Sequence, residues 1–252
     1  MISLTSYIGP KARIGRNVEI APFVYIGDEV EIGDNCEIMP YASILPGTKL
    51  GRGNRIFAGS ILGAAPMHRE ENGLGRLIIG NDNIFRENCV ITTGSFGRAT
   101  RIGNSNYFGA DISVQSGTLV GNRTTIQAGC KIGERCEIAN VVLIQHMTLV
   151  DPDINIGTLA EVQALCHVGK KVPPYITVGG PSADFCLLNT LRLRQSGVPE
   201  EAIVRLRMAC LQIYHCGYTP HAAVERIEAK YGESEELHLL LKFLSDVRVA
   251  ER

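Results

Sequence analysis

Large apolar side chains recur at every sixth residue over the first two-thirds of the chain. With two breaks, the series comprises Ile8, Ile14, Ile20, Ile26, Ile32, Ile38, Ile44, Leu50, Ile56, Leu62, Ile79, Phe85, Ile91, Ile102, Phe108, Val114, Val120, Ile126, Ile132, Ile138, Ile144, Val150, Ile156, Val162 and Val168. Neither a helix, with period 3.6, nor a single strand, with period 2, has this spacing. A six-residue repeat is typical of a parallel β-helix, in which each flat face takes one repeat. We therefore predict triangular coils, each built from three repeats.

Two polar, Gly-containing stretches interrupt the repeat, at 64–76 and 92–101. We expect surface loops there, because a solenoid tolerates insertions only on its outside, where they often serve binding. After Val168 a Pro- and Gly-rich exit leads to helical periodicity. We expect helices over about 185–195, 199–215, 220–230 and 235–248, with Thr219 and Ser234 as N-caps. The chain thus divides into a β-helix domain, 1–180, and a four-helix C-terminal domain, 181–252.

Composition narrows the function classes. The 252 residues carry a net charge of −1, which gives no electrostatic case for binding nucleic acid or an anionic membrane. No apolar run approaches the ~18 residues of a membrane span, and the N-terminus lacks a signal-peptide pattern, so we expect a cytoplasmic protein. The eight cysteines form no CxxC pair. Cys36, Cys130 and Cys136 each follow an apolar repeat residue by four, so we interpret them as small core side chains rather than disulfide or zinc ligands.

Several motifs give the chain a family resemblance. They are AAPMH in the first loop, Arg86-Glu87-Asn88 within IFRENCVITTG, the exit KKVPPYITVGG, and the helical tail with Asn189. Together they resemble the cytoplasmic UDP-N-acetylglucosamine O-acyltransferases of lipid A biosynthesis. The resemblance implies an all-β left-handed parallel β-helix with a small α-helical C-terminal domain, assembled as a homotrimer with active sites in clefts. It implies acyl carrier protein as the donor's carrier, with acyl-CoA as the other donor class, a nucleotide-sugar hydroxyl as acceptor, and no cofactor or metal.

The family's catalytic base is a histidine within a segment like H-I-A-H-D-x-x-x-G. The corresponding stretch here runs without a gap from Ser113 to Gly121, which places Ser116 at the base position and Ser113 at the preceding histidine position. Two further histidine positions that line the family cleft become Arg135 and Asp151. A serine hydroxyl does not act as a base near pH 7 without a partner that activates it. The scaffold motifs are therefore present while the usual base is absent.

Other substrate positions of the family also differ. Its P-Q-D loop motif corresponds to Pro66, Met67 and His68, and its tail motif N-x-x-G-L-x-R-R-G begins at Asn189 but has Gln195 at the first arginine position. The resemblance thus predicts substrate contacts at Met67, His68, Ser113, Ser116, Arg135, Asp151, Asn189 and Gln195. His68 is a candidate substitute base. The alternative is an ordinary solvated loop histidine.

Two more histidines, His146 and His167, are 21 residues apart, one coil plus three residues. This spacing brings them near each other, but two candidates without a third ligand do not favour a metal site. Three functions remain open. The chain is an acyltransferase of the family, an inactive or altered member that acts as a binding or scaffold trimer for a sugar nucleotide or acyl carrier protein, or a transferase with a different acceptor.

Overall fold

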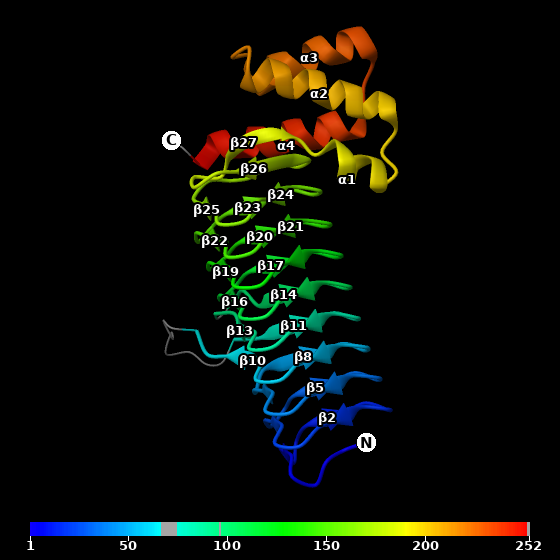
Figure 1. Cartoon of the computed structure of the whole chain (residues 1–252), viewed down its shortest axis with the longest axis vertical. Coiled ribbons are helices and arrows are strands. Elements are labelled where there is room, and N and C mark those ends of the chain that lie inside the picture. The colour runs from blue at the N-terminus through cyan, green and yellow to red at the C-terminus, as the bar shows by residue number, and fades with distance from the viewer. Residues whose placement is uncertain (67–74, 96, 251–252) are drawn as a thin grey trace.

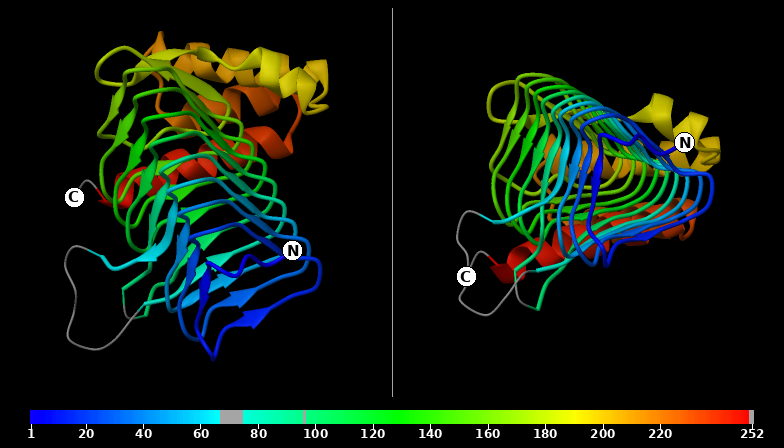
Figure 2. Two further views of the ribbon diagram at one scale, coloured as in Figure 1. Left: turned by 60° about the horizontal axis from the view of Figure 1, so that its bottom comes forward. Right: turned by 90° about the horizontal axis from the view of Figure 1, so that it is seen from below.

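The chain winds into a left-handed parallel β-helix with helices stacked on its C-terminal end (Figure 1). The computed structural model describes residues 1–66, 75–95 and 97–250, with side chains described up to residue 245. Seen along its axis, the coil is a triangular prism (Figure 2). The described strands lie in three sheets, here called A, B and C, and every strand of the repeat pairs in parallel with the strand one coil away. The predicted fold class is confirmed.

The strands are short, and each sheet takes one strand from nearly every coil. Sheet A contains β3 (Glu19–Ile20), β6 (Glu37–Ile38), β9 (Arg55–Ile56), β12 (Ile84–Phe85), β15 (Tyr107–Phe108), β18 (Thr125–Ile126), β21 (Leu143–Ile144), β24 (Glu161–Val162), β26 (Ile176–Gly179) and β27 (Asp184–Leu188). Sheet B contains β1 (Tyr7–Ile8), β4 (Tyr25–Ile26), β7 (Ser43–Ile44), β10 (Ile61–Ala64), β13 (Val90–Thr92), β16 (Ser113–Val114), β19 (Lys131–Ile132), β22 (Leu149–Val150) and β25 (His167–Val168). Sheet C contains β2 (Arg13–Ile14), β5 (Glu31–Ile32), β8 (Thr48–Leu50), β11 (Leu77–Ile79), β14 (Thr100–Ile102), β17 (Leu119–Val120), β20 (Glu137–Ile138) and β23 (Asn155–Ile156).

The six-residue repeat builds the interior. Its apolar residues point inward, and from Ile20 to Val168 they are at most 4 % exposed. Phe85 and Phe108 stack with ring centroids 4.7 Å apart on neighbouring strands of sheet A, and both rings are fully buried in the interior. The second inward position holds the predicted small side chains, among them Cys36, Cys130 and Cys136, all buried and free. Burial raises the pKa of the Cys136 thiol to about 11, which keeps it protonated.

Most corners of the prism turn through a residue in the left-handed region, three residues after the inward apolar one. Glycine or asparagine suits this conformation, as at Gly53, Asn35 and Asn88, with φ of 66°, 57° and 58°. Val141 occupies the same kind of position with φ 59°. A β-branched residue is strained there, because its side chain crowds the backbone.

Polar side chains inside the prism are satisfied by the next coil. The buried amide of Asn54 donates to the Gly51 and Gly80 carbonyls, while its oxygen accepts the side-chain and backbone N–H groups of Asn83. The oxygen of Asn83 in turn accepts the Asn106 backbone N–H at 2.9 Å. Because buried polar groups are costly when unpaired, this column is stable only as a continuous ladder.

The tail differs from prediction at its start. The segment Asp184–Leu188, expected to begin the first helix, forms strand β27 and pairs antiparallel with β26. Strand β27 thereby adds a last strand to sheet A. Phe185 on this strand stacks on Tyr214, with ring centroids 4.1 Å apart. The helices are α1 (Thr190–Gln195), α2 (Glu200–Tyr214), α3 (Pro220–Tyr231) and α4 (Glu235–Ala250). Thr219 and Ser234 cap α3 and α4 as predicted.

The tail packs directly on the final coils, with Leu193 fully buried and the Arg192 guanidinium donating to the Val141 carbonyl at 3.1 Å. Of the two predicted excursions, residues 67–74 of the first lie outside the described residues, and the second returns to strand β14 at Thr100. Among the described residues, no helix is both long enough and apolar enough to span a membrane.

Candidate active site

Four of the predicted site residues lie along one corner of the prism, between sheets B and C. We call this the BC corner and define it by the turns 115–118, 133–136, 151–154 and 169–172, one from each of four successive coils. Ser116, Arg135 and Asp151 belong to the first three turns, and Ser113 lies on β16, just before the first. Parallel stacking therefore brings together residues that are up to 38 positions apart, as the register of the repeat predicts.

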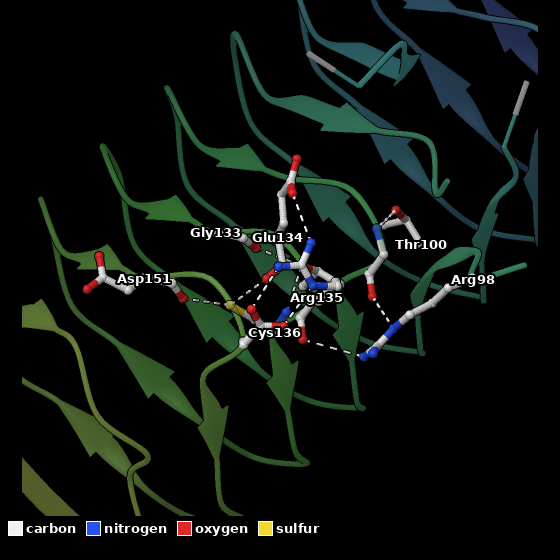
Figure 3. A network of polar contacts seen from close by, with 10 residues as sticks. Arg98, Thr100, Gly133, Glu134, Arg135, Cys136 and Asp151 are labelled. Carbon is white, nitrogen blue, oxygen red and sulfur yellow. Dashed lines mark hydrogen bonds and ion pairs between the residues drawn. The ribbon is translucent and has the colours of Figure 1, made fainter. Parts of the chain in front are cut away.

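Ser116, at the family's base position, is only 5 % exposed. Its backbone carbonyl accepts the Arg135 N–H at 2.9 Å, and the neighbouring Gly117 N–H donates to Thr100 Oγ1 at 3.0 Å. Arg98 lies across the same turn, since its Nε donates to the Gly117 carbonyl at 2.8 Å (Figure 3). The turn is thus covered by a side chain from the second excursion, and Ser116 is not presented to a substrate.

Arg135 is engaged in ion pairs rather than directed at an open cleft. Its Nε and Nη2 donate to the two Asp153 oxygens, each at 2.7 Å, and its Nη1 donates to Glu134 at 3.1 Å. The Asp153 carboxylate raises the pKa of the guanidinium, while Arg135 lowers the pKa of Asp153. Arg98 adds a pair with Glu137 at 3.0 Å. Together Asp153, Glu134 and Glu137 with the two arginines form a charged network of three carboxylates and two guanidinium groups, of which Figure 3 labels Arg98, Glu134 and Arg135.

Asp151 lies above this network and contacts a histidine. Its Oδ1 is 2.8 Å from Nε2 of His167, which lies on β25 one coil further on. The His167 side chain is 56 % exposed and that of Asp151 is 41 % exposed, so both reach solvent. The Asp151 carbonyl also accepts the Cys136 thiol, which ties its turn to the coil below (Figure 3). The result is an accessible imidazole oriented by a carboxylate.

Asn189 and Gln195 do not join this corner. Asn189 is buried at the start of α1, where its oxygen accepts the Arg192 N–H and its amide donates to Glu161 at 3.2 Å. Glu161 is on sheet A, so Asn189 lies at the corner between sheets C and A. Gln195 is exposed at the end of the same helix. Within one chain, the predicted contacts are therefore divided between two different corners.

The remaining predicted residues occupy other surfaces. Arg86 and Glu87 of the family motif form a half-buried ion pair at 3.0 Å, with Arg86 over the ring of Phe57, and they line a shallow hollow that also includes His146. His146 lies in the turn between sheets A and B, whereas His167 is on a strand of sheet B. No group of three metal-ligating side chains occurs among the described residues. Met67 and His68 lie outside the described residues.

A hollow of about 680 Å³ lies on the first coils, along the same edge between sheets B and C that carries the predicted residues further towards the tail. It lies against the first coils of sheet C, where Lys49 and Arg13 both pair with Glu31, and Lys11 pairs with Glu29. These side chains are 40–83 % exposed, and the two carboxylates neutralise only part of the positive charge, since Arg76 also lines the hollow. We interpret this hollow as a solvated charged face and place the candidate site at the BC corner.

Sequence reasoning missed the contact between Asp151 and His167 and the covering role of Arg98. The first had a signal in the repeat: His167 directly precedes an inward valine, and Asp151 directly follows the inward valine one coil earlier. In a parallel sheet, the residue just before the inward position of one strand lies diagonally beside the residue just after the inward position of the neighbouring strand. Arg98 had no such signal, because it belongs to an excursion that does not follow the repeat.

Comparison with known proteins agrees with this architecture. Residues 172–251 match the family profile described as UDP-N-acetylglucosamine O-acyltransferase, domain 2, and residues 29–64 match the bacterial transferase hexapeptide profile. The acyl-[acyl-carrier-protein]–UDP-N-acetylglucosamine O-acyltransferase of Halorhodospira halophila is 34 % identical over 95 % of this chain and 94 % of its own. The Helicobacter pylori enzyme of the same name is 39 % identical over 77 % of this chain and 73 % of its own.

Solved structures give the same result. The UDP-N-acetylglucosamine acyltransferase of Bacteroides fragilis superposes with a TM-score of 0.82 at 33 % identity, covering 96 % of both chains. The Acinetobacter baumannii protein has a TM-score of 0.92 at 24 % identity, which supports the fold alone. Since the sequence matches extend over nearly the whole chain, through both the coil and the tail, the chain belongs to the acyl-[acyl-carrier-protein]–UDP-N-acetylglucosamine O-acyltransferase family.

Proposed function

We propose that this chain transfers an acyl group from an acyl carrier protein thioester to a hydroxyl of UDP-N-acetylglucosamine. The observation that carries the proposal is the match of coil and tail together to transferases of that name, at 34 % identity over 95 % of the chain. The reaction needs no redox step. The sugar oxygen attacks the thioester carbonyl, a C–O bond forms, the C–S bond breaks, and the hydroxyl proton passes to a base and then to the leaving thiolate. No cofactor enters this scheme.

We propose further that the chain acts as a homotrimer in the cytoplasm. The predicted contacts support an assembly, because Asn189 lies at the corner between sheets C and A while Asp151 lies at the BC corner. A neighbouring subunit offers a way to bring these two corners to one cleft. Light scattering of the purified protein is expected to give three times the chain mass, and a monomer at micromolar concentration would contradict the shared cleft.

The test of activity is direct transfer. Purified protein is incubated with UDP-N-acetylglucosamine and a panel of acyl carrier protein thioesters of different chain length, and acylated sugar nucleotide is sought by mass spectrometry. We expect product with at least one donor, and a parallel panel of acyl-CoA donors tests the other donor class. No product above background with any donor would contradict the proposal. Retained binding of UDP-N-acetylglucosamine in that case would favour the binding or scaffold protein instead.

A further inference from the structure

We propose that His167, oriented by Asp151, is the general base of the transfer reaction in this chain. The inference rests on the proposed function and names the residue that accepts the hydroxyl proton, a role for which Ser116 is unsuited. Ser116 is buried beneath the turn covered by Arg98, and its hydroxyl is not a base near neutral pH. An accessible imidazole beside a carboxylate is the arrangement that general-base catalysis uses.

The geometry of the pair fixes which nitrogen is free. Nε2 of His167 lies 2.8 Å from Oδ1 of Asp151, so in the neutral imidazole Nε2–H donates to the carboxylate and Nδ1 keeps its lone pair. The backbone holds both partners, since the His167 N–H donates to the Pro181 carbonyl at 2.9 Å and the Asp151 N–H donates to the Val168 carbonyl at 3.0 Å. Asp151 is therefore a positioning residue, which sets the ring orientation and stabilises the imidazolium formed during transfer.

The His167 ring reaches solvent, and among the described residues no lysine or arginine forms an ion pair with Asp151. On sheet B the neighbour of His167 is the apolar Leu149, and Asp151 lies against Gly169, where an added Cβ would be 3.2 Å from its second oxygen. Lys170 is paired with Asp184 and so is directed to the hairpin of β26 and β27. The charged groups on the elements that adjoin His167 are Lys131, Asp151, Lys170, Lys171 and Asp184.

The chemistry balances with this base. Nδ1 of His167 takes the proton of the acceptor hydroxyl as its oxygen bonds to the thioester carbon. The imidazolium then returns that proton to the thiolate when the C–S bond breaks, so the enzyme ends unchanged. His167 is three strands of sheet B beyond Ser113, or roughly 14 Å at the usual strand spacing of about 4.8 Å. The acceptor hydroxyl must therefore lie nearer the tail than the first serine of the corner.

The test compares three purified variants with the wild type in the transfer assay. His167→Gln is expected to lower kcat by about 100-fold or more, with KM for UDP-N-acetylglucosamine within a few-fold of wild type, because the ring acts on a proton and not on binding. Asp151→Asn is expected to lower kcat less, with KM again within a few-fold of wild type, because the imidazole remains but loses the carboxylate that orients its ring. Asp151→Glu should recover part of the rate.

His146→Ala is the matched control, because His146 is also an exposed histidine but lies at the corner between sheets A and B. It should transfer at the wild-type rate. Wild-type rates in His167→Gln overturn the assignment of the base and leave the proposed function intact, as does a loss of activity confined to His68→Ala. No transfer by the wild-type protein overturns the proposed function, and the base with it. Equal loss of kcat in His167→Gln and His146→Ala also contradicts the assignment.

Discussion

Two corners of the same coils carry polar columns of different kinds. At the corner between sheets C and A, asparagines repeat from coil to coil: Asn81 Oδ1 accepts the Arg52 N–H at 3.0 Å, and Asn104 and Asn122 do the same for the coils that follow. Inside that corner, Asn83 and its neighbours form the buried ladder. Every amide there serves the backbone of another coil.

At the BC corner, the polar side chains differ from one coil to the next. Its turns present a buried serine, then an arginine held by two carboxylates, then the carboxylate that contacts His167. No side-chain type repeats there in register as asparagine does at the other corner. Repetition at one corner indicates a structural role, since each copy satisfies the same backbone group. Irregularity at the other indicates that these residues are not needed for coil stacking and so are free to serve chemistry.

The largest effect should come from breaking the buried ladder. Asn83→Ala removes the donors to Asn54 and the Gly103 carbonyl and the acceptor for the Asn106 N–H, all inside the prism. We expect a loss of about 3 kcal/mol in the free energy of unfolding, measured by denaturant titration, because each buried partner left unpaired costs ~1–3 kcal/mol. Asn81→Ala, on the outer ladder of the same coil, is the control and should cost clearly less. Equal losses would contradict the distinction between buried and exposed columns.

A smaller effect, of opposite sign, is expected at Val141. Its φ of 59° is unfavourable for a β-branched residue, and asparagine occupies the equivalent position at Asn35 and Asn88. Val141→Asn should therefore raise the free energy of unfolding by about 1 kcal/mol. Val141→Ala keeps a Cβ in the strained conformation and loses packing, so it should not stabilise. A gain with alanine as large as with asparagine would show that φ is not the cause.

The smallest effect concerns the exposed pair of Arg135 and Asp153. Arg135 lowers the pKa of Asp153 below its ordinary value of 3.8, so the pair stabilises the fold above that value and loses its contribution as the pH falls through the lowered pKa. The difference in thermal unfolding midpoint between wild type and Asp153→Asn should be small and constant at neutral pH, since both groups are solvent-exposed. It should shrink below pH 3.8. A difference that grows on acidification would have the wrong sign.

Much of the fold could be predicted from the six-residue repeat, because the inward apolar side chains from Ile20 onwards fit neither the helical period nor the period of a single strand. The tail prediction was wrong at Asp184–Leu188, where apolar residues such as Phe185 fit either a helix or a strand. The segment is a strand because it forms a hairpin with β26, and its own apolar pattern does not reveal that pairing. Cap signals at Thr219 and Ser234 were reliable because a cap depends only on neighbouring residues.

The position of the candidate site could be predicted from the sequence, but the contacts of its side chains could not. The six-residue register placed Ser116, Arg135 and Asp151 on one corner, since stacking depends only on the count of residues. The partners of these side chains, Asp153 for Arg135 and His167 for Asp151, depend on side-chain conformation across coils. The cover over Ser116 comes from Arg98, in a segment without the repeat.

The central claim is that acyl transfer by this chain takes place beside His167 rather than beside Ser116. A crystal structure with UDP-N-acetylglucosamine bound tests it most directly. We predict an acceptor hydroxyl within about 3 Å of His167 Nδ1, with Asp151 still bonded to the opposite nitrogen. A sugar bound against Ser116, with Arg98 moved aside and no hydroxyl near His167, would contradict the account.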